Sequence, residues 1–445
     1  MSDRTSSGLR VYVSSVMHFG EHFLNFHSLC RFTCRLPQVQ RRSRWLAHNV
    51  PMRIGIVTES FLPSVNGVTN SVVRLLEYLE KSEHEAIVVA PGEGPERFGR
   101  FTVVRARSIS VPRYRNFELG IPSPRLRETL ESFRPDVVHL AAPFALGAFA
   151  GRICRQMGVP TVAVYQTDVP GFLSHYGLAP TAGLIWKWVG HIHNKANLTL
   201  APSTAALSDL HEHGVHNVEM WRRGVDGALF SPTKRDELLR SSWGIDGRIV
   251  VGYVGRLAHE KRVEDLAVLT QDPRIRLVVV GDGPQRECLQ RLMPDAVFPG
   301  FLSGEALARH FASFDIFVHT GVNETFCQTL QEALASGVPC VAPAQGGPLD
   351  IVADQMNGCL FRAGDTEHLR ACIERLLNDE TRTRLAQRAR GSVEQRTWHS
   401  VNEQLLAHLT RATGVGLPNN IHLLNASRQT TEDTPDLRTV PMDAA

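Results

Sequence analysis

The chain has 445 residues, which suits two domains better than one, and 43% of them are hydrophobic, enough for packed cores. Its formal net charge is only +3, and the first 51 residues hold seven arginines against two acidic residues. The rest of the chain is therefore not basic. This disfavours a nucleic-acid-binding function, which needs a positively charged surface, and we expect no nucleic-acid partner.

Residues 1–51 differ in character from the remainder of the chain. They are rich in arginine and show no steady periodicity, a composition that mimics a transit peptide. We favour an upstream translation start with the true start near Met52, and expect a disordered or mis-assigned extension. His27, Cys30 and Cys34 could be drawn as a zinc site, but their spacing matches no standard pattern and a fourth ligand is missing.

From Met52 onward, apolar strands alternate with helical segments, which indicates a parallel sheet covered on both faces. Helices are expected at Thr69–Glu80 and Leu126–Phe133. The turn-rich segment RRGVDGALFSP (222–232) predicts a hinge or a linker. The strands are expected at Arg53–Thr58, Ala86–Ala90, Val103–Arg105, Val137–Leu140, Thr161–Tyr165 and Leu198–Ala201.

The same pattern restarts beyond the hinge. Strands are expected at Ile249–Val254, Leu277–Val280, Ala296–Phe298, Ile316–His319 and Pro339–Ala342, and helices at Val263–Leu269, Gln285–Met293, Glu305–Ala312, Cys327–Ser336 and Glu367–Asn378. The predicted fold class is α/β, with two doubly wound parallel-sheet domains and a cleft at the carboxyl ends of their strands. The polar, aperiodic segment 414–445 is expected to be disordered.

The cysteines and the apolar runs indicate the cellular environment of the protein. The eight cysteines are scattered without a CxxC pair, which indicates a reducing compartment and no disulfide framework. The longest apolar run, residues 141–151, is too short to span a bilayer.

Two glycine-containing loops bear on the ligand. Asn66 and Gly67 precede a helix, where a glycine lets backbone N–H groups approach an anion, although an ordinary turn would look the same. A nicotinamide-binding fingerprint would need GxGxxG, and it is absent from this loop. VVVGDGPQRE (278–287) has Gly281 and Gly283 but Glu287 where a third glycine would fall, which weakens the dehydrogenase interpretation.

Charged residues follow the strands of the second half. Arg256 and Lys261 lie where a buried strand opens into the next helix, and two cations at a cleft suit a diphosphate. The alternative is a solvated helix start with Glu260 as a local partner. Glu332, one turn after Gln328, could accept hydroxyl protons from a ribose, and Glu324 could reach a second polyol. Spacing alone also allows Glu324 to support a helix N-terminus and Glu332 to be solvated.

In this order the motifs resemble a known family. Over residues 52–410 the chain is similar to retaining glycosyltransferases of family 4, which have the GT-B architecture of two Rossmann-like domains. The resemblance implies an acceptor-side domain at 52–223, a nucleotide-sugar-binding domain at 224–395, and a helix at 396–413 that packs back on the first domain. It is carried by GVD (224–226), GRLAHEK (255–261), VVGDGP (279–284) and the pair Glu324 and Glu332 in an E-x7-E element.

The resemblance implies roles for these residues. Arg256 and Lys261 would hold the donor diphosphate, Glu332 the ribose and Glu324 the hexose hydroxyls. The implied donor-binding set is Asn66, Gly67, Gly255, Arg256, Lys261, Gly283, Glu324, Thr325, Phe326, Cys327, Gln328 and Glu332. The catalytic candidates are Glu324, Arg256, Lys261, His139 and Asp168.

The acceptor side is implied less directly. The candidates are His139, Gln166 and Asp168. His139 is expected to end a strand at the cleft, with a packed strand-end histidine as the alternative. Gln166 stands in YQTD where many relatives have a histidine, so donor-sugar contacts at that position are in doubt. Asp168 is then a candidate for orienting the acceptor hydroxyl.

A narrower resemblance suggests the substrates. TESFLPSVNGVTNSV (58–72), PDVVHL (135–140), VYQTDVPGF (164–172) and ETFCQTLQEALASG (324–337) are similar to actinobacterial GDP-mannose-dependent α-mannosyltransferases. This implies mannose transfer from GDP-mannose to a membrane glycolipid, a glucuronosyl diacylglycerol or a phosphatidylinositol mannoside, without a metal or other cofactor. A UDP-sugar donor, or a non-catalytic sensor of sugar nucleotides, are the alternatives.

A basic cluster in the first half could meet the membrane. It consists of Arg105, Arg107, Arg113, Arg115, Arg125 and Arg127, interleaved with Tyr114 and Phe117. Such a patch could rest on an anionic surface, or could be a solvated loop. Trp186 and Trp188 are expected to pack in the core. The expected location is cytoplasmic, peripheral on the inner face of the plasma membrane.

Overall fold

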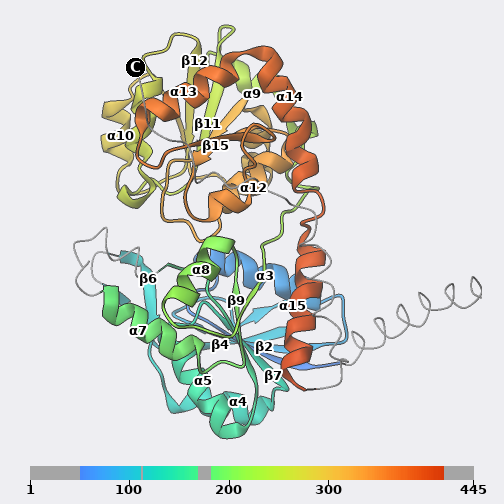
Figure 1. Ribbon diagram of the computed structural model, residues 1–445. Helices are drawn as coiled ribbons and strands as arrows, with labels where there is room; N and C mark the ends of the chain where they lie inside the picture. Colours follow the sequence, from blue (N-terminus) through green and yellow to red (C-terminus); the bar gives the residue numbers. More distant parts are fainter. Residues whose placement is uncertain (1–50, 112–113, 169–181, 415–445) are drawn as a thin grey trace, which may run out of the picture. The chain divides into compact units, whose positions relative to one another are not determined.

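The computed structural model describes residues 51–111, 114–168 and 182–414 (Figure 1). Apart from residues 51 and 414, the segments expected to be disordered lie outside these ranges, as do the candidate zinc ligands His27, Cys30 and Cys34. The described chain forms two sheet-based lobes. We call residues 51–223 with the last helix the first lobe, and residues 224–395 the second lobe.

The first lobe is built on an eight-stranded sheet in the order β10-β9-β8-β7-β1-β2-β4-β3. Neighbours pair in parallel except β3 with β4. A separate antiparallel pair, β5 and β6, was not predicted. The strands are β1 Arg53–Thr58, β2 Glu85–Pro91, β3 Arg97–Phe98, β4 Phe101–Ala106, β5 Ser108–Val111, β6 Tyr114–Gly120, β7 Val137–Ala141, β8 Thr161–Val164, β9 Leu198–Ala201 and β10 Val218–Met220.

Helices cover both faces of this sheet. One face packs against α3 and α15 through residues such as Ile54, Leu75 and Leu405. The other face packs against α4 and α5 through residues such as Val138 and Leu130. The helices are α3 Gly67–Leu79, α4 Pro124–Phe133, α5 Leu146–Met157, α7 Ala182–His193, α8 Thr204–Glu212 and α15 Trp398–Ala412. Burial on both faces explains why the central strands are continuously apolar.

The second lobe has a six-stranded parallel sheet in the order β13-β12-β11-β14-β15-β16. Its strands are β11 Ile249–Val254, β12 Ile275–Val280, β13 Val297–Gly300, β14 Ile316–Val318, β15 Cys340–Pro343 and β16 Gly358–Phe361. Its helices are α9 Glu237–Ser242, α10 Arg286–Leu292, α11 Gly304–Ser313, α12 Gln328–Ala335, α13 Thr366–Leu377 and α14 Asp379–Ala389, with 3₁₀ turns η2 Pro232–Lys234, η3 His259–Lys261, η4 Val263–Leu269, η5 Gly347–Asp350 and η6 Arg390–Ser392.

One predicted element has a different type. The segment Val263–Leu269 was expected to be an α-helix and is a 3₁₀ helix, η4. Arg262, just before it, has a φ of 49°, which separates η4 from the preceding turn η3. Two tight turns therefore replace one continuous helix at this point.

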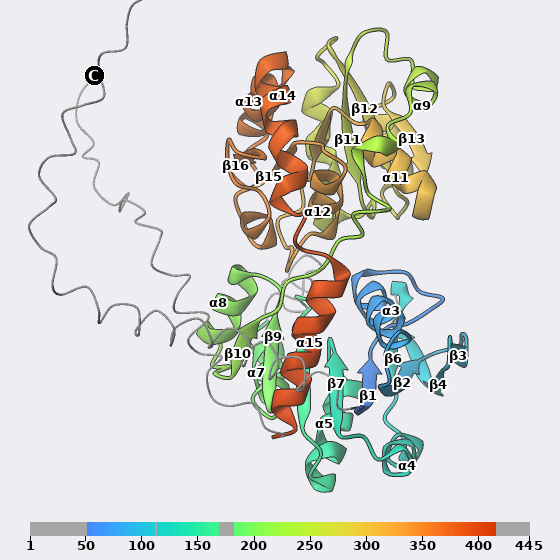
Figure 2. The same cartoon turned by 90° about the vertical axis from the view of Figure 1, so that its right-hand side faces the viewer.

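Two segments of chain connect the lobes and lie side by side. The Val225 N–H donates to the Arg396 carbonyl at 2.8 Å, and Val225 pairs with Thr397 in a parallel bridge. After the second crossing, α15 contacts α3, β7 and β8 of the first lobe (Figure 2). The Trp221 indole N–H donates to the Val401 carbonyl at 2.9 Å, which fixes α15 to the end of the first lobe.

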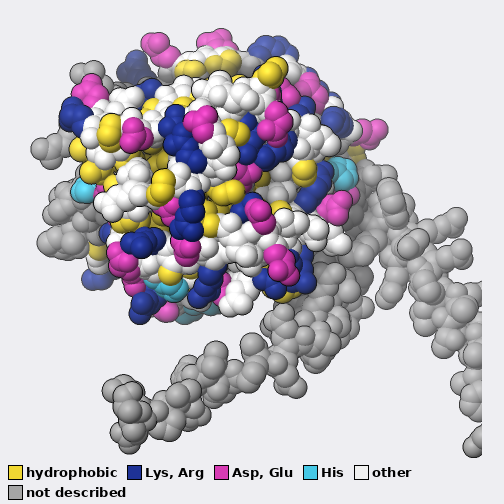
Figure 3. Space-filling view, turned by 90° about the horizontal axis from the view of Figure 1, so that it is seen from above, with side chains coloured by type: hydrophobic (Ala, Val, Ile, Leu, Met, Phe, Trp, Pro, Cys, Tyr) yellow, Lys and Arg dark blue, Asp and Glu magenta, His cyan; other side chains and the backbone are white. Residues whose placement is uncertain are grey.

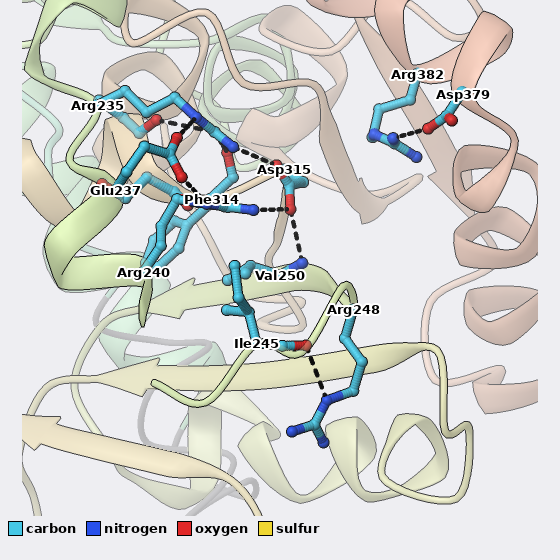
Figure 4. A network of polar contacts seen from close by, with 12 residues as sticks. Arg235, Glu237, Arg240, Ile245, Arg248, Val250, Phe314, Asp315, Asp379 and Arg382 are labelled. Atoms are coloured by element: carbon cyan, nitrogen blue, oxygen red, sulfur yellow. Dashed lines mark hydrogen bonds and ion pairs between the residues drawn. The ribbon is translucent and has the colours of Figure 1, made fainter. Parts of the chain in front are cut away.

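A charged network holds the second lobe together at the start of β14. One Asp315 oxygen accepts from Arg235 at 3.0 Å, and the other accepts from Arg240 at 3.1 Å and from the Val250 N–H at 2.8 Å (Figure 4). Asp315 precedes β14, at the opposite end from the loop that carries Glu324. The network is therefore structural and attaches α9 to the sheet.

The surface and the thiols are ordinary for such a fold. On the face drawn in Figure 3, acidic and basic side chains are interspersed. No helix among the described residues is long and apolar enough to cross a membrane. The described cysteines are all free thiols: Cys154, Cys288, Cys327, Cys340, Cys359 and Cys372.

Candidate active site

Glycines bring together the loops that follow β11 and β12. Gly281 and Gly283 have φ values of 139° and 156°, and a Cβ on either would overlap the carbonyl oxygen of Gly255 or Leu257. The Leu257 N–H donates to the Asp282 carbonyl at 2.9 Å. Only glycine allows this backbone contact, so the two loops form one surface at the carboxyl ends of the strands.

The side chains of Arg256 and Lys261 both extend from this surface, but their surroundings differ. The Arg256 side chain is 45% exposed, and its Nη1 lies 3.9 Å from Glu260. Lys261 Nζ lies 2.5 Å from Glu324 Oε1, and its backbone carbonyl accepts from Thr320 Oγ1 at 2.8 Å. Arg256 is thus exposed, with a long contact to Glu260, while Lys261 is paired closely with the carboxylate predicted to contact the sugar.

Glu324 is the centre of a charged cluster. Its Oε1 atom is 2.5 Å from Lys261 Nζ and 3.1 Å from His319 Nε2. The ring of His319 lies parallel to that of Tyr253 at 6.3 Å between centroids, and its side chain is 4% exposed. Both contacts fall on one oxygen, so Glu324 Oε2 is the atom left for a ligand hydroxyl.

The cluster sets the charges of its members. Burial would raise the pKa of Glu324, but Lys261 and His319 outweigh it and lower the pKa to about 2. Burial would lower the pKa of His319, but Cys327 and Glu324 raise it to about 10. Glu324 is therefore an anion and His319 a cation at neutral pH. The histidine was not among the predicted site residues, although it ends the expected strand Ile316–His319.

His319, Glu324 and Cys327 are close enough to be considered as metal ligands. A metal ion on Glu324 Oε1 would compete with the ammonium group of Lys261, which lies 2.5 Å from that atom. The chain itself therefore supplies the cation at this point. The expectation of a reaction without a metal stays a prediction.

The loop that carries Glu324 packs tightly against the loop after β15. The Gly347 N–H donates to the Glu324 carbonyl at 2.7 Å, and a Cβ on Gly347 would lie 2.5 Å from the Phe326 Cα. Phe326 is buried, and Cys327 has a φ of 76°. This backbone arrangement orients Glu324 toward Lys261 and starts α12 at Gln328.

Glu332 lies one turn into α12 and is half-buried. Burial raises the pKa of its carboxyl to about 8, although Gln328, Arg223 and Arg74 act in the opposite direction. Gln328 Nε2 donates to the Gly224 carbonyl at 3.0 Å, which places the start of α12 against the hinge. A carboxyl with such a pKa gains from hydroxyl donors that stabilise its ionised form.

Arg223, in the hinge, was missed by the sequence analysis. Its guanidinium is buried and donates to Ser71 Oγ at 2.7 Å and to the Gly67 carbonyl. Gln331 of α12 donates to the Arg223 carbonyl at 3.0 Å. Burial lowers the pKa of Arg223 to about 10, against the effect of Glu332. Arg223 thus connects the first loop, the hinge and α12, a role that RRG in a turn-rich segment did not reveal.

Asn66 and Gly67 have structural partners. Asn66 caps α3, its Oδ1 accepting from the Thr69 N–H at 3.0 Å and its Nδ2 donating to Ser60 Oγ at 2.6 Å. A Cβ on Gly67 would lie 3.0 Å from Arg223 Nη1. The cap and the close approach of Arg223 explain both residues without a ligand, and their predicted role at the phosphates stays a prediction.

Gln166 joins the two lobes at the carboxyl end of β8. Its Oε1 accepts from Ser71 Oγ and its carbonyl accepts from Thr325 Oγ1, both at 2.9 Å. Its side chain is buried, and Nε2 has no partner among the described residues. Asp168 accepts from the Tyr165 hydroxyl at 3.2 Å. Gln166 and Thr325 thus bring the predicted acceptor and donor sides into contact.

His139 is not where it was expected. It was predicted to end a strand at the cleft, but β7 continues to Ala141, and His139 pairs with Ile56 and Val162 within the sheet. It is 1% exposed, and its ring lies 6.5 Å from that of Trp221. Burial lowers its pKa to about 4. His139 is a packed core histidine, because it lies within β7, two residues before the end of the strand.

A further missed residue, Glu59, supports the carboxyl-end loops of the first lobe. Its Oε1 accepts from the N–H groups of Phe144, Ala145 and Gly147 at 2.8, 2.8 and 2.9 Å. Burial raises the pKa of Glu59, although these backbone bonds lower it. Glu59 caps the start of α5 from the loop after β1, and therefore holds the loops after β1 and β7 together.

The predicted basic cluster is not a single free patch. Arg105 donates to the carbonyls of Leu62 and Pro95 at 2.7 and 2.9 Å, and Arg127 pairs with Glu131 at 3.0 Å. Arg107 and Arg125 are exposed. Arg113, and the side chains of Tyr114, Arg115 and Phe117, lie outside what the structure describes. Two of the cluster's six arginines are therefore engaged within the lobe.

Comparison with known proteins gives a consistent result. A profile described as Glycosyltransferase Family 4 matches residues 65–228, and one described as Glycosyl transferases group 1 matches residues 235–392. The chain is 46% identical to the GDP-mannose-dependent alpha-mannosyltransferase of Corynebacterium glutamicum, covering 80% of this chain and 88% of the relative. Identity is 48% to the protein of that name from Mycobacterium tuberculosis, covering 82% and 97%.

More distant similarities agree with the fold. The sulfoquinovosyl transferase SQD2 of Arabidopsis thaliana is 34% identical, covering 80% of this chain and 72% of the relative. Among solved structures, Anabaena Alr3699/HepE in complex with UDP superposes with a TM-score of 0.68 at 20% identity, covering 81% of this chain and all of that chain. The latter likeness confirms the predicted GT-B architecture.

Proposed function

Because the chain belongs to the family-4 glycosyltransferases, close to the GDP-mannose-dependent α-mannosyltransferases, we propose that it transfers mannose from GDP-mannose to a membrane glycolipid with retention of configuration. The acceptor is a glucuronosyl diacylglycerol or a phosphatidylinositol mannoside, met on the inner face of the plasma membrane. The single observation that carries the proposal is the Lys261–Glu324–His319 cluster beside the exposed Arg256.

The cluster accounts for both halves of the donor. Departure of a nucleoside diphosphate builds negative charge, and the fixed cations Arg256 and Lys261 stabilise it without rearranging. The free oxygen of Glu324 accepts a hydroxyl of the hexose, while its charge is maintained by Lys261 and His319. Glu332 accepts the ribose hydroxyls. Asp168, beyond Gln166 at the first-lobe side, orients the acceptor hydroxyl.

The hinge has a place in this scheme. Arg223 joins the first loop to the start of the hinge, and Gln328 and Gln331 join the hinge to α12. Closure about this connection would exclude water from the activated sugar, and thereby limit hydrolysis of the donor.

A different donor is the main alternative within this fold. The 34% identical relative is named a sulfoquinovosyl transferase, and its name points to another sugar. A sensor without catalysis is disfavoured, because a carboxylate held ionised between two cations is a costly arrangement for binding alone.

Turnover of radiolabelled GDP-mannose with membrane lipids tests the proposal. We expect a labelled lipid product that unlabelled GDP-mannose competes away and UDP-glucose does not, and that the Glu324→Ala variant fails to form. Efficient competition by UDP-sugars would show that the donor is a UDP-sugar instead. Equal product from the wild type and from the Glu324→Ala variant would show that Glu324 is not a functional residue.

A further inference from the structure

Two cavities of similar size lie in the described chain apart from the Glu324 cluster. The first, roughly 490 Å³, is at the hinge, and its lining carries both signs, with Arg74 and Arg390 beside Asp226 and Glu394. Arg74 pairs with Asp226 at 3.3 Å. The second, roughly 480 Å³, is lined mainly by residues of α5 and of α7 and its C-terminal end in the first lobe. We call it the α5–α7 cavity.

The α5–α7 cavity combines an apolar wall with a positive rim. Leu140, Phe149 and Ile192 belong to the wall. Arg152 and Arg155 come from α5, three residues apart and hence on one face of the helix. Lys195 follows the end of α7. All three basic side chains are exposed.

These charges are not balanced by the lobe itself. Within the described ranges, no acidic residue lines the cavity, and none of Arg152, Arg155 and Lys195 takes part in an ion pair. The Lys195 ammonium lies 2.6 Å from His191 Nε2. Slight burial lowers the pKa of His191, and the nearby charges of Lys195 and Arg155 lower it further. An anion at this rim would relieve the repulsion between its cations.

The outer face of α7 continues the apolar wall to the surface. Leu184 is 69% exposed and Trp188, one turn later, is 40% exposed. The Trp188 indole N–H donates to the Phe144 carbonyl at 3.0 Å, which holds the ring in place. Trp186 faces the protein instead and stacks on His213 at 3.8 Å. The expectation of core packing is therefore confirmed for Trp186 and wrong for Trp188.

We propose that the α5–α7 cavity binds the head group of an anionic phospholipid at a bilayer surface, with Leu184 and Trp188 entering the interface. Cations suit the phosphate and any further anionic group, the apolar wall suits the start of the acyl chains, and tryptophan is favoured at membrane interfaces. The choice of a lipid, rather than a soluble anion, rests on the membrane acceptor proposed above.

The proposed surface differs from the basic cluster that the sequence suggested. Arg105 and Arg127 of that cluster bond within the lobe, whereas the rim of the α5–α7 cavity has no internal counter-ion among the described residues. Arg107 and Arg125 are exposed, lie in the same lobe and do not line the cavity. They provide a control with the same change of charge.

Binding to vesicles that contain no glycolipid acceptor tests the site. The full chain is incubated with vesicles of phosphatidylcholine alone, or with phosphatidylglycerol added, and sedimented. We expect binding only to the anionic vesicles, and loss of that binding in high salt. Replacing two cations, Arg152→Gln with Arg155→Gln, is expected to weaken partitioning roughly 25-fold, about fivefold for each charge near the surface. The control Arg107→Gln with Arg125→Gln is expected to change it much less.

Equal weakening by the two double variants would overturn the site, because net charge alone would then explain binding. Equal binding to neutral vesicles would also overturn it. Mannosyl transfer to detergent-dispersed acceptor is measured in parallel. Transfer without vesicle binding would contradict only this inference, while vesicle binding without transfer would contradict only the proposed function.

Fluorescence gives a second readout that does not depend on charge. Brominated anionic lipids are expected to quench part of the tryptophan emission, and Trp188→Phe is expected to lose most of that quenching while still sedimenting with vesicles. Quenching that is unchanged in Trp188→Phe would show that α7 does not enter the interface, and would overturn the proposal.

Discussion

The two lobes build their parts of the site differently. In the second lobe, Lys261 and His319 both contact one oxygen of Glu324, and all three side chains are charged. In the first lobe, the corresponding end of the sheet is occupied by Gln166, whose amide is buried and partly unpartnered among the described residues. His139, a catalytic candidate of that lobe, is buried in the sheet and held neutral.

This difference indicates that the fold positions the charged groups of the donor side more firmly than those of the acceptor side. A donor such as GDP-mannose always carries a charged diphosphate, so cations and a carboxylate that the fold itself positions can serve every turnover. On the first-lobe side, Gln166 instead presents a neutral amide whose Nε2 has no partner among the described residues. We therefore expect substitutions in the second lobe to affect transfer most, and those in the first lobe to affect stability or acceptor use.

The largest effect is expected for Glu324→Gln. The variant keeps the shape but removes the charge that Lys261 and His319 neutralise, and we expect kcat/KM for GDP-mannose to fall roughly 10²–10³-fold. The exposed Glu287→Gln is the matched control and should retain wild-type activity. A loss of less than threefold in Glu324→Gln would show that the cluster is irrelevant to transfer. The proposed difference between the two lobes would then be wrong.

A somewhat smaller effect is expected for His319→Gln. Loss of the cation that lies 3.1 Å from Glu324 should lower kcat/KM roughly 10–100-fold, about 1.5–3 kcal/mol for a polar contact with a charged group. If His319 acts through Glu324, the double variant with Glu324→Gln should be no worse than Glu324→Gln alone. Additive losses would assign His319 an independent role. The exposed His259→Gln serves as the control.

A pH dependence is expected from Glu332. Its pKa is about 8 without ligand, and ribose hydroxyls that donate to the carboxylate favour the ionised form. Affinity for GDP-mannose should therefore rise up to tenfold per unit as pH increases toward 8, and level off above it. The diphosphate of GDP-mannose is esterified at both ends and does not titrate in this range. The same profile in Glu332→Gln would refute the assignment.

The smallest effect, on stability alone, is expected for Glu59→Ala. Removing the side chain leaves three N–H groups at the start of α5 without their acceptor, and should lower the free energy of unfolding by about 1–2 kcal/mol. Urea denaturation of this variant, with exposed Glu83→Ala as reference, measures the loss. A strong loss of donor affinity with unchanged stability would place Glu59 in the site and blur the distinction between the lobes.

Much of the second lobe's site could be predicted from sequence, because its loops are short and directly follow buried strands. Gly255, Gly283, Lys261 and Glu324 lie on the loops that the motifs predict, and glycine at positions 281 and 283 is required for the contact between those loops. The pairing of Lys261 with Glu324 was not predicted, since 63 residues separate them in the chain.

What sequence reasoning missed depends on contacts between distant segments. Arg223 lies in a segment that reads as a turn, and its role arises only when Gly67 and Ser71 approach it. Glu59 becomes a cap only when α5 begins beside β1. His139 was misplaced because the end of an apolar strand is poorly defined in sequence, and β7 runs two residues beyond it, to Ala141.

Calorimetric binding of GDP and GMP to the wild type and to Arg256→Gln tests whether the second lobe holds a diphosphate. If Arg256 and the Lys261 cluster hold a diphosphate, GDP should bind the wild type at least tenfold more tightly than GMP. Arg256→Gln should reduce that ratio toward one with little effect on GMP. An unchanged ratio in the variant, or equal binding of the two nucleotides by the wild type, would contradict the account.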